Sequence, residues 1–93
     1  MLMKCAICSE ELENPKFASN YPGFVCRECD SRAVNATGQT PHHESWYDDG
    51  DNPVFIDGVK CWRRYRYGGY VTMRDEHDCS DISEFYEKHG IIL

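Results

Sequence analysis

The sequence predicts a small α+β domain with a cysteine-bearing amino-terminal module, a three-stranded antiparallel meander and a C-terminal helix. Three observations predict it: two C-x2-C pairs near the start, two-residue turns between runs of β-forming residues, and an apolar stripe at helical spacing near the end. A chain of 93 residues has room for one domain. We therefore expect residues 1–93 to form a single domain, with a module over 1–40 packed against a meander and helix over 54–93.

The first element is built around the pairs Cys5-Ala-Ile-Cys8 and Cys26-Arg-Glu-Cys29. A C-x2-C pair in a tight turn brings two sulfurs to one side of the backbone, and two such pairs supply the four thiolates of a tetrahedral zinc site. We therefore predict one structural zinc ion held by Cys5, Cys8, Cys26 and Cys29. Iron also suits four thiolates, and disulfides or a redox-active pair are the remaining alternatives.

The interval between the cysteine pairs predicts a hairpin followed by a helix. Residues 16–19 and 24–26 read as two short strands around a turn at 20–23, where proline fixes φ and glycine allows positive φ. Residues 27–37 read as a short helix that stops at Gly38. The last two cysteines then fall in the first helical turn.

This order of elements and the C-x2-C-x17-C-x2-C spacing resemble the treble-clef zinc fingers, the GATA type in particular. The resemblance covers residues 5 to about 38 and implies a structural zinc on the four cysteines. It does not extend to DNA binding, because GATA-type fingers rely on a basic tail after the helix. Here Gly38 leads into Pro41-His42-His43-Glu44 and an acidic run. The treble clef is a widely reused scaffold, so it says little about function.

The middle of the chain predicts three strands over 54–56, 59–67 and 70–73, joined by turns at Asp57-Gly58 and Gly68-Gly69. Strand alternation then divides the side chains between two faces. The first face is mainly aliphatic and tyrosine and should cover the core: Val54, Ile56, Val59, Cys61, Arg63, Tyr65, Tyr67, Tyr70 and Thr72. The second face mixes bases with apolar groups and contains our candidate binding residues: Lys60, Trp62, Arg64 and Arg66, beside Phe55, Val71 and Met73.

The last element is a helix that we expect to begin near Ser80 as N-cap, with Asp81 in the first turn, where the helix dipole favours an acid. The residues at helical spacing that form its apolar stripe are Ile82, Phe85, Tyr86 and His89. Gly90 suits the position after the helix end.

The charge pattern bears on the partner. The net charge of −6 opposes nonspecific attraction to nucleic acid, but residues 59–74 hold five bases and no acid. Bases interleaved with aromatic residues suit either a protein interface or a single-stranded nucleic acid. Our leading hypothesis is a protein-interaction or adaptor module, and the alternative is single-stranded nucleic-acid binding through the second face. Both require that this face does not pair with the protein's own acids.

An enzyme with an unrecognised active site is a third, weaker hypothesis. The sequence has no H-E-x-x-H, phosphate-binding glycine loop or nucleophile motif, and a four-thiolate zinc offers no open position for water. We therefore expect that the protein is not an enzyme.

A second metal site is an open question, and its candidate ligands are Cys61, Cys79 and His77. Six cysteines without an apolar leader suggest metal thiolates in a reducing, cytoplasmic compartment, and the short apolar runs predict no membrane span.

Overall fold

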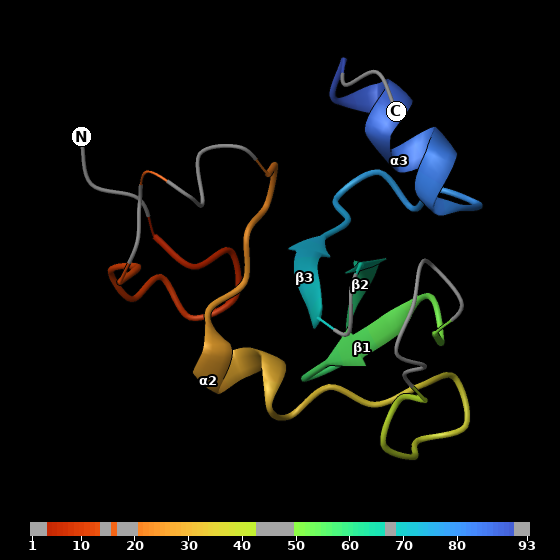
Figure 1. Cartoon of the computed structure of the whole chain (residues 1–93), viewed down its shortest axis with the longest axis horizontal. Helices are drawn as coiled ribbons and strands as arrows, with labels where there is room; N and C mark the ends of the chain where they lie inside the picture. Colours follow the sequence, from red (N-terminus) through yellow and green to blue (C-terminus); the bar gives the residue numbers. More distant parts are fainter. Residues whose placement is uncertain (1–3, 14–15, 17–20, 43–49, 67–68, 91–93) are drawn as a thin grey trace.

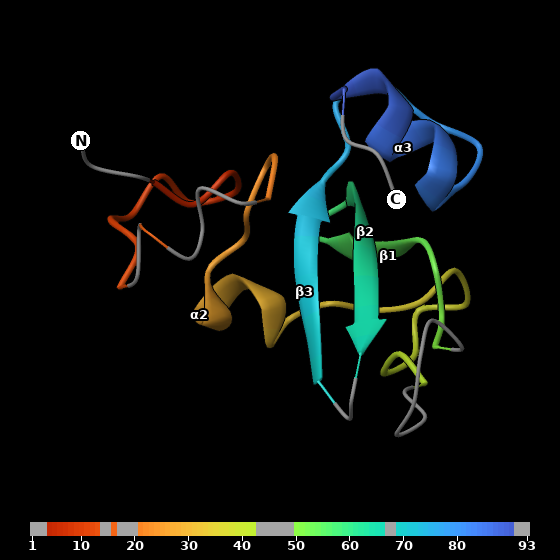
Figure 2. The same ribbon diagram turned by 45° about the horizontal axis from the view of Figure 1, so that its top comes forward.

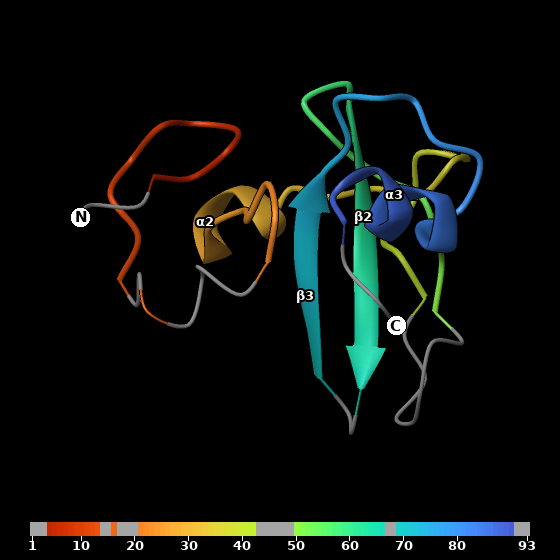
Figure 3. The same ribbon diagram turned by 90° about the horizontal axis from the view of Figure 1, so that it is seen from above.

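The protein folds as a small α+β unit, seen here in a computed structural model that describes residues 4–13, 16, 21–42, 50–66 and 69–90. The elements are, in chain order, α2 (Arg27–Asp30), β1 (Val54–Ile56), β2 (Val59–Arg66), β3 (Gly69–Arg74) and α3 (Ile82–Lys88). Figures 1 and 3 show α2 and α3 on opposite sides of the three-stranded sheet. In this part of the chain, no helix has the length and apolar character needed to cross a bilayer.

The first hairpin confirms the predicted turn. The sheet order is β1-β2-β3, both pairs are antiparallel, and Ile56 lies opposite Val59. Asp57 and Gly58 both have positive φ, 52° and 80°. This is the combination that a two-residue type I′ turn requires, and the right-handed twist of the strands favours it.

The second hairpin differs from the prediction by two residues. Tyr65, not Tyr67, lies opposite Tyr70, and Arg66 lies opposite Gly69, so the turn is not at Gly68-Gly69. This register sets Arg63 opposite Thr72, and both side chains contact the same carboxylate of α2, as described below. A two-residue shift keeps every side chain on its original face. For the described side chains, the predicted division into two faces is therefore confirmed although the register was wrong. The predicted positions of Tyr67 and of the Arg66 side chain lie outside what the structure describes.

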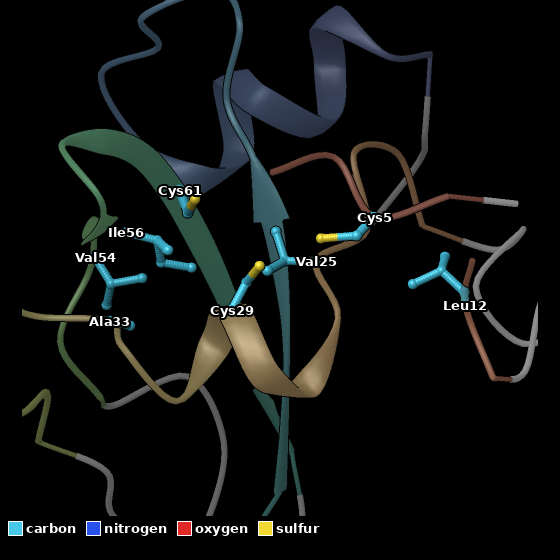
Figure 4. Close-up of a cluster of buried hydrophobic side chains, with 8 residues drawn as sticks. All are labelled: Cys5, Leu12, Val25, Cys29, Ala33, Val54, Ile56 and Cys61. Carbon is cyan, nitrogen blue, oxygen red and sulfur yellow. The ribbon is translucent and has the colours of Figure 1, made fainter. Parts of the chain in front are cut away.

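The first face of the sheet packs against the amino-terminal module, by which we mean the described residues between 4 and 42. Figures 2 and 4 show how this module lies beside the sheet and which side chains it contributes. The shared cluster consists of Cys5, Leu12, Val25, Cys29, Ala33, Val54, Ile56 and Cys61, all at most 7% exposed. One apolar core thus joins the cysteine-bearing segment to β1 and β2.

The amino-terminal module also pairs with the outer edge of β3. Phe24 forms an antiparallel bridge with Met73, and the Val25 N–H donates to the Thr72 carbonyl oxygen at 3.0 Å. Gly23 has a φ of 63°, and a Cβ there would lie 2.7 Å from a β3 carbonyl oxygen. Only glycine allows so close an approach. The predicted strand 24–26 therefore pairs with β3, and most of its predicted partner, 16–19, lies outside the described residues.

The other edge of the sheet is covered by the segment after α2. Val34 and Phe55 of β1 exchange two backbone hydrogen bonds of 2.9 and 2.7 Å. The prediction of a helix over 27–37 is therefore wrong in length. The helix α2 ends at Asp30, because a residue that pairs with a strand edge must be extended. Gly38 has the expected positive φ of 83° but lies in a later turn.

The second face is covered by α3. Trp62 and Met73 form a second buried cluster with Cys79, Phe85 and Tyr86. The helix begins one residue later than predicted, because Asp81, not Ser80, is the N-cap and accepts from the Glu84 N–H at 2.7 Å. Gly90 follows the helix with a φ of 71°, as expected.

Candidate metal centre

The four predicted ligands converge on one point. The Sγ atoms of Cys5, Cys8, Cys26 and Cys29 all lie within 4.8 Å of one another. The Sγ atoms of Cys8 and Cys26 are 3.8 Å apart. A tetrahedral zinc with Zn–S bonds of about 2.3 Å places its sulfurs about 3.8 Å apart. The geometry therefore defines a four-thiolate site that could bind a metal ion such as zinc.

Two local structures supply these sulfurs. The first pair lies in a turn that is closed by a hydrogen bond of 3.0 Å from the Ser9 N–H to the Cys5 carbonyl oxygen. In the second pair, Cys26 is the extended N-cap of α2 and Cys29 lies within the helix. The N-cap position and the third helical residue lie on one side of the first turn. This confirms the predicted placement of the last two cysteines.

Hydrogen-bond donors surround the sulfurs. The N–H groups of Ile7 and Cys26 point at the Cys5 Sγ at 3.3 and 3.2 Å, and the Cys29 N–H points at the Cys26 Sγ at 3.5 Å. The Arg32 guanidinium lies 3.5 Å from the Cys29 Sγ. Donors of this kind orient metal-bound thiolates and stabilise their negative charge.

The thiols do not ionise equally in the absence of a cation. Burial raises the pKa of Cys5, but the N–H donors from Cys26, Cys8 and Ile7 outweigh it and lower the pKa to about 7. Burial, followed by the neighbouring cysteines, raises the pKa of Cys29 to about 12. Once one thiolate forms, its charge opposes the next. Four thiolates at this spacing therefore require a cation.

A buried ion pair ties α2 to the sheet. The Arg63 guanidinium lies 2.8 Å from Asp30 Oδ1, and the two side chains are only 4% and 13% exposed. Thr72 donates a hydrogen bond to the same Asp30 oxygen and accepts one from Arg63 Nε. The Arg63 guanidinium also lies over the Tyr70 ring at 4.1 Å. This network fixes the helix that holds Cys29 against the first face.

Two further contacts link the site to the sheet. Arg32 pairs with Asp57 of the first hairpin at 2.9 Å, and this hydrogen bond lowers the pKa of Asp57. From β3, the Arg74 guanidinium donates to the Ala6 carbonyl oxygen at 2.8 Å, within the first cysteine turn. Sequence analysis missed these positioning residues, because no local spacing relates positions that lie so far apart in the chain.

The candidate binding residues of the second face are largely occupied. Trp62 is 3% exposed, and its Nε1–H donates to Asp75 Oδ2 at 2.9 Å. Lys60 pairs with Asp78 at 2.9 Å. The expectation that Trp62 is presented to a partner is wrong, because α3 covers this part of the face.

The structure neither confirms nor contradicts the other two candidate binding residues of the second face, Arg64 and Arg66. The Arg64 guanidinium lies 5.6 Å from the centre of the Tyr86 ring of α3. The side chain of Arg66 lies outside what the structure describes. A role for these two arginines in binding stays a prediction.

The structure does not bring together the residues of the suggested second metal site. Cys61 lies in the first-face cluster and Cys79 in the second-face cluster, on opposite sides of the sheet. The His77 ring packs edge-on against His89 at 5.3 Å. Within the described ranges, the four-cysteine cluster is the one group found with metal-binding spacing.

Comparison of the chain with known proteins finds no match. No protein-family model matches the chain, and neither the curated proteins nor the solved structures give a significant match.

Proposed function

We propose that this protein is a zinc-structured interaction module, in which one zinc ion on Cys5, Cys8, Cys26 and Cys29 fixes a treble-clef-like segment onto the sheet. The observation that carries the proposal is the convergence of the four Sγ atoms within 4.8 Å. The surrounding N–H donors and the Arg32 guanidinium support it, because they would offset the negative charge of a four-thiolate zinc.

The metal is structural in this proposal. Four thiolates fill the tetrahedral shell of zinc and leave no position for an activated water. Zinc binding releases about 10–16 kcal/mol in finger peptides, and whole domains have unfolding free energies of only about 5–15 kcal/mol. A segment whose helix α2 has only four residues would therefore owe most of its order to the ion. The thiols must stay reduced, which fits a cytoplasmic protein.

A protein partner is better supported than a nucleic acid. Stacking of bases needs accessible rings, but Trp62 lies under α3 and is 3% exposed. On the same face, the Lys60 ammonium is paired with Asp78 at 2.9 Å. The net charge of −6 also repels phosphate. These observations weaken the second face as a nucleic-acid platform and direct attention to other surfaces.

Metal analysis tests the proposal. The protein purified under reducing conditions should contain one zinc per chain, and a strong chelator should lower its melting temperature and disperse the signals of the amino-terminal module. Cobalt substitution should give the intense sulfur-to-cobalt charge-transfer band of a tetrahedral thiolate site. Iron in place of zinc would correct the identity of the metal. A melt that is unchanged by the chelator, with no bound metal, would overturn the proposal.

A further inference from the structure

A groove lies between the amino-terminal module and β3, and Cys26 is the one residue of the four-cysteine site that lines it. Its cavity volume is about 670 Å³, within the range of ligand-binding pockets in proteins. The lining comes from three segments that are distant in sequence: Glu10, Glu11, Leu12 and Glu13; Phe24, Val25, Cys26, Arg27, Glu28 and Asp30; and Tyr70, Val71 and Thr72.

The floor of this groove is apolar. Leu12 is 6% exposed, and Phe24 and Val71 are half-buried. Tyr70 is 41% exposed and is the one large hydrophobic side chain found exposed among the described residues. An apolar floor of this kind favours burial of an aliphatic or aromatic side chain of a ligand.

The rim of the groove is acidic. Glu10, Glu11, Glu13 and Glu28 are all exposed, and Arg27 is the single base in the lining. Within the described part of the chain, no ion pair joins any of these four glutamates to a base. The fifth acid of the lining, Asp30, is paired with Arg63. The rim therefore has an excess of negative charge, and no ion pair between described residues neutralises these four glutamates.

We propose that this groove binds an extended lysine- and arginine-rich segment of a partner protein that also carries an apolar side chain. The inference rests on the proposed function, because Cys26 and its neighbours, which the zinc would hold in place, form part of the groove. Cationic heads would meet the glutamates, and the aliphatic stems of lysine and arginine would lie along the apolar floor. The same negative rim would repel a nucleic acid.

The partner chemistry is thus opposite to the one that the basic block of β2 suggested. That block would favour an acidic partner, but much of it pairs with the protein's own groups. Among the described residues, the four glutamates of the rim form no ion pair with a base. Charge complementarity therefore favours a basic ligand at the groove.

The test measures binding of a labelled peptide, Gly-Lys-Arg-Leu-Lys-Leu-Arg-Lys-Gly, by fluorescence anisotropy to the zinc-loaded full chain. Metal content and melting temperature are measured on the same sample first. Comparison ligands are the peptide with glutamate at every basic position, the peptide with serine at both leucines, and labelled oligothymidylate. The variant Glu11→Gln/Glu28→Gln removes two rim charges, and Glu76→Gln/Glu87→Gln removes two exposed charges elsewhere.

The basic peptide should bind, and its affinity should fall as sodium chloride rises from about 50 mM to about 300 mM, since salt screens exposed charges. Glu11→Gln/Glu28→Gln should weaken binding roughly fivefold to tenfold. The control variant should change it by less than about twofold. The serine peptide should bind more weakly, and the glutamate peptide and the oligothymidylate should not bind.

Several results would overturn the groove proposal. They are no binding of the basic peptide to zinc-loaded folded protein, equal weakening by the two double variants, or no preference for the leucine-containing peptide. Each leaves the zinc proposal intact, because metal and fold are verified in the same sample. Binding of oligothymidylate in preference to the peptide would also reject it, in favour of a nucleic-acid ligand.

Discussion

The two sides of the sheet are covered in different ways. On the second face, α3 contributes the large side chains Phe85 and Tyr86, which pack on Trp62 and Met73. On the first face, the amino-terminal module contributes fewer large side chains and includes two of the candidate sulfur ligands, and its helix α2 has four residues. Apolar area scales with stabilisation. From this comparison we expect the second face to be held by packing and the first face to depend on the proposed metal ion.

Removing one sulfur should have the largest effect. We expect Cys29→Ser to abolish metal binding and disorder the amino-terminal module, a loss of more than about 5 kcal/mol, because the proposed zinc site would supply most of the folding free energy of this module. Elemental analysis and amide-proton NMR dispersion would measure this. The matched control is Cys61→Ala, which removes a buried thiol that is not one of the four candidate ligands and should keep the metal. Retention of one zinc by Cys29→Ser would contradict the assigned ligand set.

Truncating the α3 core should come next. Phe85 is fully buried, so Phe85→Ala should destabilise the protein by about 3–5 kcal/mol. Chemical denaturation followed by circular dichroism would give this value, with the milder Phe85→Leu as the control. The variant should still bind one zinc per chain, since the cavity lies on the other face. If Phe85→Ala lost as much zinc affinity as Cys29→Ser, packing on the second face and metal binding on the first face would not be independent.

Two ion pairs link the module to the sheet, and we expect them to contribute differently to the free energy of unfolding. Asp30→Ala strands the buried Arg63 guanidinium, and breaking a buried pair costs about 3 kcal/mol. Asp57→Ala removes the exposed partner of Arg32 and should have little effect, because solvent screens such pairs. Urea denaturation of both zinc-loaded variants at neutral pH compares them directly. A larger loss from Asp57→Ala would mean that the module is held mainly through the hairpin.

A smaller effect is expected from acid on the α3 side. Burial raises the pKa of Asp75, but hydrogen bonds from Trp62, His77 and Cys79 outweigh it, so the pKa lies below its usual 3.8. A lowered pKa contributes stability that is present above about pH 4 and is lost as the pH falls through the folded value.

The measurement is acid titration of the chelated full chain in a Trp46→Phe background, followed through Trp62 fluorescence. Asp75→Asn should have a flatter profile below about pH 4. Metal release at low pH complicates the zinc-loaded form, so the chelated form is used. Identical profiles for Asp75 and Asp75→Asn would show that this carboxylate does not stabilise the folded state. A chelated chain with no folded signal from Trp62 would show that the second face also needs the cation.

Local sequence signals predicted the features that depend on neighbouring residues. The four cysteines converge as the C-x2-C spacing indicated, the Asp57-Gly58 turn is type I′, and the two faces of the meander are as expected. The helix length after Cys26 was not predictable, because it is set by the pairing of Val34 with the edge of β1, more than twenty positions on. Propensity favoured helix, and a tertiary contact overrode it.

The burial of Trp62 and the acidic groove had no local signal either. Alternation assigns a side chain to a face but does not say what covers that face. The glutamates at 10, 11 and 13 are close in sequence and could have been noted as a cluster. Their position beside Phe24 and Val71 depends on the bridge between the amino-terminal module and β3.

The amino-terminal module pairs with both edges of the sheet, and this affects how the protein should behave at high concentration. The edge of a β-sheet exposes unpaired N–H and C=O groups, which can pair with other chains and lead to aggregation or fibrils. Here Phe24 pairs with the β3 edge of the sheet and Val34 pairs with the β1 edge. If the proposed zinc ion holds the module in place, its removal should expose both edges of the sheet at once, and we expect the metal-free protein to aggregate more readily than the zinc-loaded protein.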